Sequence, residues 1–189
     1  MKKTALITGA SGDIGACIAA QFAKNGYDLL LHYNRDKNSC EKLRQKLENE
    51  YKITATLFGA NFENESEVEG IAKRVRLENG GVDVLVNNAG VSLVELFQCV
   101  DNAAASRIFS VNLQNTMLLT QRILPMMISQ KSGCIINISS MWGMVGASME
   151  VHYSATKAGI IGMTKALAKE VGLSGVRVNC VCPGLIAGK

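Results

Sequence analysis

A tyrosine and a lysine stand four residues apart in the segment YSATK, residues 153–157. At this spacing on a helix, the side chains of Tyr153 and Lys157 lie one turn apart on the same face. An ammonium near a phenol favours the phenolate and lowers the phenol pKa from about 10. The pair therefore predicts a general acid that protonates a carbonyl oxygen near neutral pH. A solvated helix face is the alternative reading of this spacing taken alone.

A glycine-rich turn, TGASGDIG at residues 8–15, lies between an apolar run and a predicted helix. Free backbone amides and the helix dipole make the start of a helix a natural anion site. The spacing of the glycines differs from the G-x-G-x-x-G dinucleotide fingerprint. The turn therefore predicts a phosphate-binding loop, with a plain strand-to-helix connection as the alternative.

Asp13 places a carboxylate where a phosphate would have to bind. Aspartate is a favourable helix cap, because its oxygen accepts a hydrogen bond from a free backbone amide. It also tolerates a positive φ better than most residues do. We expect Asp13 to cap the helix with its carboxylate turned away from the phosphates.

Short apolar runs alternate with helical patterns along the chain. This alternation predicts an α/β fold with a doubly wound, mostly parallel sheet of the Rossmann type, in a single domain over residues 1–189. Ligands of such sheets bind beyond the carboxyl ends of the strands. The expected strands cover residues 4–8, 28–33, 54–58, 82–86, 134–138 and 177–181, and the expected helices cover residues 14–25, 39–51, 66–79, 103–131 and 151–172.

The composition argues for a folded protein that binds neither nucleic acid nor a membrane. Of the 189 residues, 48% are hydrophobic and 19% charged, and the net charge is only +4 without a dense Lys/Arg cluster. No signal peptide or membrane span is visible. The six cysteines have no zinc-type spacing, so we expect no metal and a reducing, cytoplasmic location.

Several motifs in a fixed order resemble those of the short-chain dehydrogenases/reductases, over nearly the whole chain. This resemblance implies that Tyr153 exchanges a proton with the substrate oxygen, and that Lys157 tunes Tyr153 and holds the nicotinamide ribose. Ser140, chosen over Ser139 from the family's Ser–Tyr separation, hydrogen-bonds the substrate oxygen, and Asn112 anchors a proton-relay water. The motifs are TGASGDIG, Asn87-Asn88-Ala89-Gly90, Ser110-Val111-Asn112, Ile138-Ser139-Ser140, YSATK and Pro183-Gly184.

The same resemblance implies a set of contacts to a dinucleotide. The glycine-rich turn lines the pyrophosphate, and the stretch after the fourth strand follows the adenosine ribose. At position 188 this chain departs from the family, with a glycine where a threonine often contacts the nicotinamide. An asparagine stands where the family has an aspartate at the adenine, and its oxygen can still accept a hydrogen bond. For Asn87, a purely structural role is the alternative to a cofactor contact. The implied contacts are Gly9, Ser11, Gly12, Ile14, Asn61, Phe62, Asn88, Ala89, Gly90, Tyr153, Lys157 and Ile186.

The end of the second strand distinguishes the two nicotinamide cofactors. NAD-dependent enzymes place an acidic residue there for the ribose hydroxyls. This chain has Tyr33 or Asn34 at that position, with Arg35 next to it. A guanidinium suits a 2′-phosphate, so the sequence favours NADP(H). Neutralisation of Arg35 by Asp36 is the alternative.

The resemblance extends to 3-oxoacyl-acyl-carrier-protein reductases, which implies a 3-oxoacyl thioester as the substrate. Lys131 fits a basic position at the rim that recognises the carrier protein. The segment 139–157 also resembles reductases of the 5-aminopentanone modification on elongation factor P, so this ketone is an alternative substrate. There, Glu150 pairs with a cationic amine, and Trp142 lies near the cleft; a solvated carboxylate and a packing tryptophan are the competing interpretations. In general, the expected partner is a small-molecule or carrier-bound ketone.

Two departures from the family pattern affect the prediction. Asp13 occupies the family's second glycine position, and the chain ends before the final strand and substrate lid expected of the family. Two further hypotheses therefore stand beside the reductase: a catalytically silent NADP-binding homologue, and an NAD-dependent alcohol or sugar dehydrogenase, which Arg35 disfavours. The resemblance also implies a homo-oligomer, a tetramer in the family.

Overall fold

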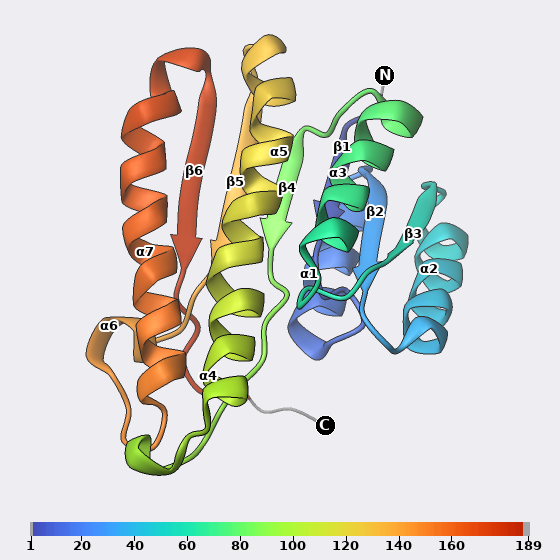
Figure 1. The fold of residues 1–189 in the computed structure, drawn as a ribbon. Coiled ribbons are helices and arrows are strands. Elements are labelled where there is room, and N and C mark those ends of the chain that lie inside the picture. Colours follow the sequence, from blue (N-terminus) through green and yellow to red (C-terminus); the bar gives the residue numbers. More distant parts are fainter. Residues whose placement is uncertain (1, 187–189) are drawn as a thin grey trace.

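A six-stranded sheet with every strand parallel forms the centre of the protein in the computed structural model, which describes residues 2–186 (Figure 1). The sheet order is β3-β2-β1-β4-β5-β6. This order confirms the predicted doubly wound, Rossmann-type fold. Gly188, which replaces the threonine often found in the family, lies outside the described residues. The strands are β1 (Thr4–Ile7), β2 (Asp28–Tyr33), β3 (Ala55–Gly59), β4 (Val84–Asn87), β5 (Gly133–Ile138) and β6 (Val176–Val181).

The helices follow the predicted alternation, with one correction. The single helix expected over residues 103–131 is interrupted by η2 (Ser110–Gln114), a π-helical turn, because the chain there brings the Asn112 side chain against Val91. The short helices η1 and α6 were not expected from the sequence. The helices are α1 (Asp13–Lys24), α2 (Lys37–Tyr51), α3 (Glu65–Asn79), η1 (Phe97–Cys99), α4 (Asn102–Phe109), α5 (Asn115–Ser129), α6 (Trp142–Val145), α7 (Val151–Val171) and η3 (Gly172–Ser174).

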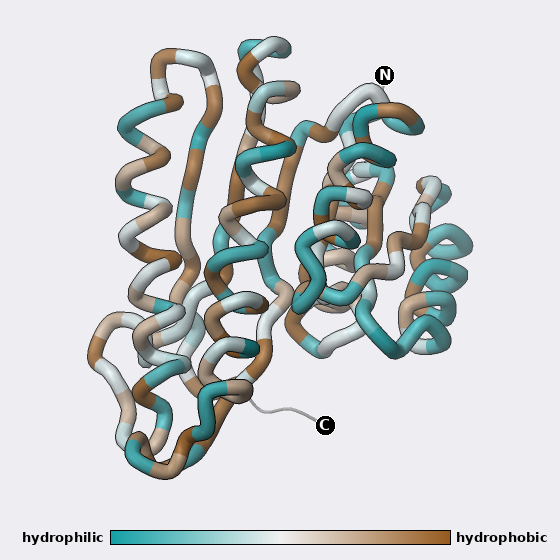
Figure 2. Tube along the Cα trace, viewed as in Figure 1, coloured by the Kyte–Doolittle hydropathy of each residue, from teal (hydrophilic) through white to brown (hydrophobic). Residues whose placement is uncertain are grey.

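Alternate residues of each strand enter two separate hydrophobic layers, because successive side chains of a strand point to opposite faces. Leu6 and Leu30 pack with α3, α5 and α7, while Ile7 and Leu31 pack with α1 and α2. In Figure 2 the hydrophobic residues gather on the strands, whereas most residues of α2 are hydrophilic. Helices on both faces explain why the strands read as continuous apolar runs.

Buried amides connect the sheet to the helices in front of it. The Asn87 amide donates to Thr120 at 2.9 Å and to Asn137 at 2.8 Å, and the Asn137 amide donates to Thr164 at 2.8 Å. These bonds join β4 and β5 to α5 and α7. The structural role considered for Asn87 is therefore what the structure shows.

The strand order reverses between β1 and β4: β2 and β3 follow on one side of β1, whereas β4, β5 and β6 follow on the other side. The crevice beyond the carboxyl ends of these strands is the usual ligand site of such a sheet. In Figure 1 the strand arrows point toward this end of the molecule, where α4 and α6 also lie. Among the described residues, no helix is long and apolar enough to cross a membrane.

Candidate active site

Two adjoining cavities lie at the carboxyl ends of the strands. The larger, of about 480 Å³, is a cleft that we call the dinucleotide cleft. The smaller, of about 250 Å³, contains Ser140 and Tyr153 and is called the tyrosine pocket. Ile14 and Ile186 line both cavities, so the two spaces meet at these side chains. Of the predicted cofactor contacts, the dinucleotide cleft is lined by Gly9, Ser11, Gly12, Ile14, Phe62, Asn88, Ala89, Gly90 and Ile186.

The glycine-rich turn forms one wall of the dinucleotide cleft. Gly9 has a φ of +66°, a conformation that favours glycine. A Cβ on Gly15 would lie 2.2 Å from the Gly9 carbonyl oxygen, so the first turn of α1 packs directly against the loop backbone. The helix begins after Gly12, and no side chain caps it. Its first amides therefore remain free to bind an anion.

The prediction that Asp13 caps helix α1 is wrong. Gly12 is the N-cap, with extended φ and ψ of −84° and 162°, and Asp13 is the first helical residue. Asp13 also has an ordinary negative φ, so its tolerance of positive φ is not used. Its exposed side chain lines the dinucleotide cleft, where its charge lies near the site for a phosphate.

Thr8 and Asn88 attach the glycine-rich turn to the end of β4. The Thr8 hydroxyl accepts hydrogen bonds from the amides of Asn88 and Ala89, both at 2.9 Å, and donates to the Val86 carbonyl at 3.2 Å. The Asn88 side chain donates to the carbonyls of Thr8 and Gly9 at 2.9 and 3.2 Å. These bonds fix the two loops at the point where the strand order reverses.

Asn112 lies in the π-helical turn and reaches the segment after β4. Its amide exchanges two hydrogen bonds of 2.8 Å with the backbone of Val91. A Cβ on Gly90 would lie 3.3 Å from Asn112 Oδ1 and 3.5 Å from Lys157 Nζ, so the two side chains meet over this glycine. Single π turns within helices are frequent at functional sites.

The two serines after β5 point to different environments. The Ser139 hydroxyl donates to the Lys157 carbonyl at 2.8 Å and so joins β5 to α7. The Ser140 hydroxyl accepts from the Trp142 amide at 3.2 Å and lies beside Tyr153 in the tyrosine pocket. Ser140 is therefore the serine whose hydroxyl lies beside the phenol.

Helix α7 places Tyr153 in the tyrosine pocket and buries Lys157 behind it. The Lys157 ammonium lies 5.7 Å from the centre of the Tyr153 ring and donates to the Ile138 carbonyl at 3.0 Å. Burial lowers the pKa of Lys157 to about 8. Lys157 lies outside the lining of the dinucleotide cleft, and so does Asn112.

The expectation of a lowered phenol pKa does not hold for this structure. Burial raises the pKa of Tyr153; the Ser140 hydroxyl opposes this rise, and the Glu150 carboxylate adds to it. Desolvation outweighs the other influences because the phenolate loses water while the lysine ammonium is bonded to a carbonyl. The structure therefore holds Tyr153 as a neutral phenol.

Trp142 and Glu150 both line the tyrosine pocket, at the start of α6 and before α7. Glu150 is the only charged side chain among the described residues that line it. Glu150 is half-buried and lies in the same pocket as Tyr153, and its pairing with an amine stays a prediction. A positive group in the pocket would find a counter-charge there.

Arg35 follows β2 and is exposed next to the dinucleotide cleft. It does not line the cleft, whereas its neighbour Asn34 does. The Asp36 carboxylate accepts from the Ser39 amide at 2.9 Å and caps α2. No ion pair joins Arg35 to Asp36 among residues 2–186.

Asn61 lies outside the cleft lining, whereas its neighbour Phe62 is buried and lines the cleft. The Asn61 side-chain oxygen accepts from the Glu63 amide at 2.9 Å, within its own turn. The sequence therefore predicted the wall correctly at Phe62, while the Asn61 oxygen is already used by the turn.

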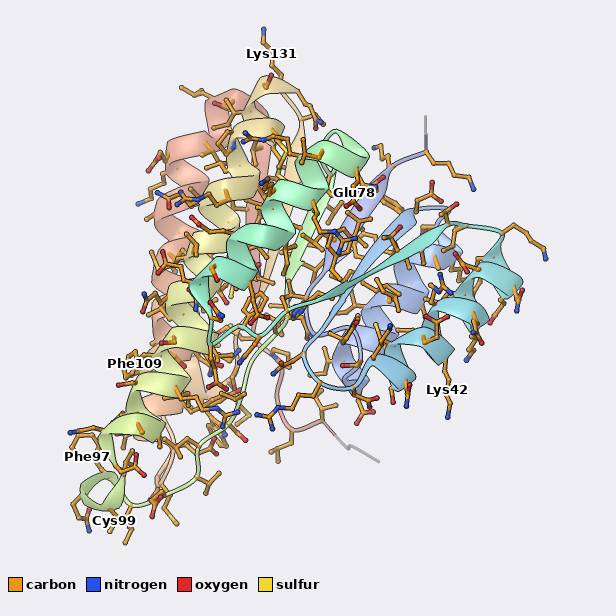
Figure 3. The ribbon with its side chains drawn as sticks, turned by 45° about the vertical axis from the view of Figure 1, so that its right-hand side comes forward. Lys42, Glu78, Phe97, Cys99, Phe109 and Lys131 are labelled. Carbon is orange, nitrogen blue, oxygen red and sulfur yellow. The ribbon has the colours of Figure 1, made fainter. Side chains whose placement is uncertain are left out.

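Lys131 does not belong to the rim of the cleft. Helix α5 runs back from the carboxyl ends of the strands, and Lys131 lies in the turn between α5 and the beginning of β5. Figure 3 shows Lys131 at one end of the molecule and the segment of Phe97 and Cys99 at the other. The predicted contact of Lys131 with a carrier protein at the cleft is therefore wrong.

Other residues of the cleft were not identified from the sequence as contacts. His32 is the most buried polar one, at 2% exposure, and bonds the Gly9 amide at 3.0 Å. In the sequence, the only sign that His32 lies in the cleft is its position one residue before the predicted end of the second strand. The remaining lining residues are Asp13, Gly15, Asn34, Val91 and Val111.

Two known bacterial proteins are similar to this chain over nearly its whole length. The uncharacterized oxidoreductase YmfI of Bacillus subtilis is 41% identical over 186 residues, which cover 98% of this chain and 76% of YmfI. The 3-oxoacyl-[acyl-carrier-protein] reductase FabG of Staphylococcus aureus is 38% identical over 98% of this chain and 75% of FabG.

Solved structures with the same fold include proteins bound to NADPH. L-sorbose reductase from Gluconobacter frateurii, complexed with NADPH and L-sorbose, has a TM-score of 0.95 at 29% identity. The match covers 99% of this chain and 71% of the reductase chain. A short-chain dehydrogenase from Sphingobium yanoikuyae in complex with NADPH has a TM-score of 0.92 at 29% identity, over 98% and 72% of the two chains. The family model for short chain dehydrogenases matches residues 3–189, and the chain belongs to this family.

Proposed function

We propose that the protein reduces a ketone with NADPH, with Tyr153 as the general acid. The observation that carries the proposal is the junction of the two cavities at Ile14 and Ile186. A dinucleotide in the larger cavity and a ketone in the smaller would meet at these side chains. The hydride is the chemistry that a bound nicotinamide cofactor supplies.

The residues of the dinucleotide cleft fit such a cofactor. Gly15 packs so closely on Gly9 that no Cβ can enter, and the uncapped first turn of α1 offers free amides. A pyrophosphate is the group that such a loop and helix start bind well. The phosphate-binding interpretation of the turn is therefore part of the proposal, together with the contacts at Asn88, Ala89 and Gly90.

Tyr153 and Ser140 would bind and protonate the ketone oxygen. A neutral phenol has the proton that the developing alkoxide needs, and burial keeps Tyr153 in this form. The Ser140 hydroxyl beside it can donate a second hydrogen bond to the same oxygen. Replacing Tyr153 with phenylalanine keeps the ring and removes the proton.

Lys157 and Asn112 would support this proton transfer. A lysine pKa of about 8 leaves most of the ammonium protonated at neutral pH, able to hold a ribose hydroxyl and stabilise the phenolate after transfer. The Asn112 side chain is engaged with Val91, so the water proposed for this residue would bind its main-chain carbonyl.

The cofactor is NADPH rather than NADH in this proposal. Arg35 is exposed beside the cleft and free of Asp36, so its guanidinium is available to a 2′-phosphate. The NADPH complexes of the sorbose reductase and the Sphingobium dehydrogenase support this choice. Arg35→Ala should weaken NADPH binding about tenfold or more and leave NADH binding unchanged in calorimetric titrations. Equal losses for both cofactors would contradict the assignment.

For the substrate, the tyrosine pocket favours a ketone that carries a cationic amine. Glu150 is its only charged lining residue in the described chain, and Trp142 supplies an aromatic wall. A cationic group is attracted both to a carboxylate and to an aromatic face. The 5-aminopentanone modification of elongation factor P has this chemistry.

A 3-oxoacyl thioester is the second candidate, supported by the FabG relatives. Its reacting 3-oxoacyl end carries no positive charge for Glu150 to pair with, and Lys131 lies at the wrong end of the molecule to bind a carrier protein at this site. The structure therefore gives the thioester weaker support than the sequence did.

The two substrates are separated by comparing Glu150→Gln with Glu95→Gln. Glu95 is a nearby carboxylate outside the tyrosine pocket, so its variant controls for the change in charge. We expect Glu150→Gln to lower kcat/KM about tenfold for an aliphatic amino ketone and not for acetoacetyl-coenzyme A. Equal changes for both ketones would refute the amine-binding role of Glu150. Equal, background-level NADPH oxidation by the wild type and Tyr153→Phe would refute the reductase itself.

A further inference from the structure

His32 connects the two loops that flank the adenosine side of the dinucleotide cleft. Its Nδ1 atom accepts a hydrogen bond of 3.0 Å from the Gly9 amide, and its Nε2 atom lies 2.9 Å from the Ala60 carbonyl oxygen. The ring also packs against Phe62, with 4.8 Å between the ring centres. One buried side chain thus contacts the glycine-rich turn, the end of the β3 segment and the aromatic wall.

The partners determine the state of the imidazole ring. An amide can only donate and a carbonyl can only accept, so the ring must be neutral with its proton on Nε2. Burial lowers the pKa of His32 to about 4, which keeps this form at neutral pH. The His32 carbonyl also accepts from the Ala10 amide at 2.8 Å. The turn is therefore attached to His32 through both its side chain and its backbone.

The neighbouring strand residue does not share this role. Tyr33 points to the other face of β2, where its hydroxyl packs over Gly59. Neither Gly9 nor Ala60 bonds any other side chain through the atoms that face His32. Backbone bonds attach each loop to β2, since the Ala10 amide donates to the His32 carbonyl and the Ala60 amide donates to the Tyr33 carbonyl. Within the described chain, the His32 ring is the side chain that bonds both loops at once.

We propose that His32 is a positioning residue for NADP(H), which holds the pyrophosphate turn at a fixed distance from the adenine wall. The inference rests on the proposed cofactor. Gly9 has the positive φ that shapes the turn, and Ala60 lies two residues before Phe62. Holding both in place before the cofactor arrives reduces the ordering cost of binding.

Three substitutions separate the two hydrogen bonds. His32→Asn places a side-chain oxygen near the position of Nδ1 and keeps an acceptor for Gly9. His32→Gln places an amide nitrogen near the position of Nε2 and keeps only a donor for Ala60. His32→Phe retains the ring against Phe62 and loses both bonds.

We expect His32→Gln and His32→Phe to bind NADPH about tenfold more weakly or worse, since the Gly9 amide is left without its partner. His32→Asn keeps the Gly9 bond but loses the Ala60 bond, so it should show a smaller loss, of about threefold. In steady-state assays, the weak variants should show a raised KM for NADPH with kcat unchanged at saturation, because His32 touches no reacting atom. Adenosine 2′,5′-bisphosphate, which lacks the nicotinamide half, should show the same order of affinities.

Two controls distinguish positioning from general loss of stability. His152→Gln replaces the chain's other histidine, which stacks on Phe97 outside the cleft, and should bind NADPH like the wild type. Val75→Ala lowers stability from the core beneath α3 without reaching the cleft. The inference is overturned if all three His32 variants bind NADPH as the wild type does, or if their losses only follow their melting temperatures as for Val75→Ala. A wild type that binds no NADPH would instead overturn the proposed function.

Discussion

Gly15→Ala should both destabilise the protein and impair the dinucleotide cleft. The added Cβ would lie 2.2 Å from the Gly9 oxygen, 2.9 Å from Ala10 Cα and 2.9 Å from Asn88 Nδ2. Two of these atoms belong to the backbone, and the third bonds the carbonyls of Thr8 and Gly9. No rotamer change relieves such an overlap, so the glycine-rich turn itself must move.

The expected magnitude combines two opposing contributions. Alanine in a helix is favoured over glycine by about 1 kcal/mol, whereas overpacking costs about 1–3 kcal/mol or more. Because two of the clashing atoms belong to the backbone of the loop, the overpacking cost lies at the upper end of this range. We therefore expect a net loss of about 2 kcal/mol in the free energy of unfolding, or about 4–8 °C in Tm.

Two alanine variants serve as matched controls. A Cβ on Gly12 would lie 3.6 Å from the Gly9 oxygen, an ordinary contact, and a Cβ on Gly70 in α3 would meet nothing within 4 Å. Gly70→Ala should raise stability by about 0.5–1 kcal/mol, and Gly12→Ala should cost less than about 1 kcal/mol. Urea unfolding and calorimetric NADPH titration measure both properties. A Gly15→Ala protein with wild-type stability and NADPH affinity would refute the packing that we describe.

Three further predictions follow from the hydrogen bonds and charges of the cleft. Asp13→Asn should leave Tm nearly unchanged, because Asp13 is not the cap, and should tighten NADPH binding in low salt more than in high salt; a large loss of Tm would contradict this. The pKa of His32 is about 4 in the folded protein and 6.5 when unfolded, so its contribution is complete above pH 6.5, and about 3 kcal/mol is lost as the pH falls to 4. Urea titrations should show a smaller loss over this range for His32→Phe, and an equal loss would disprove the assignment. Thr8→Val should cost about 2–4 kcal/mol in urea unfolding, since it leaves the Asn88 and Ala89 amides without their acceptor, and an unaffected midpoint would show that water replaces the hydroxyl.

Much of the fold follows from local sequence patterns. Strand β2 has the predicted bounds, and the remaining strands differ by one or two residues, because each is a short apolar run between turn residues. The placement of Ser140 beside Tyr153 also matches the prediction, since their motifs follow a strand and begin a helix. These features depend on residues that are close in the sequence.

The wrong predictions concern features that depend on tertiary structure rather than on the local sequence. Asp13 is a good cap by residue type, but the backbone places Gly12 at the cap position. The phenol pKa of Tyr153 depends on burial and on the carbonyl that binds Lys157, neither of which the spacing reveals. Lys131 was misplaced because its position depends on the direction in which α5 crosses the sheet. His32 has partners 23 and 28 residues away in the chain, so no local pattern marks it.

Deuterium transfer from NADPH tests the central claim most directly. The wild-type protein is incubated with an aliphatic amino ketone and NADPH deuterated at one or the other face of the nicotinamide C4, and the alcohol product is analysed by mass spectrometry. Since Tyr153, Ser140 and the cleft hold both reactants in one orientation, we predict deuterium at the carbinol carbon from only one of the two labelled cofactors, and no product with Tyr153→Phe. An alcohol without deuterium from either cofactor, or the same yield with Tyr153→Phe, would contradict the account.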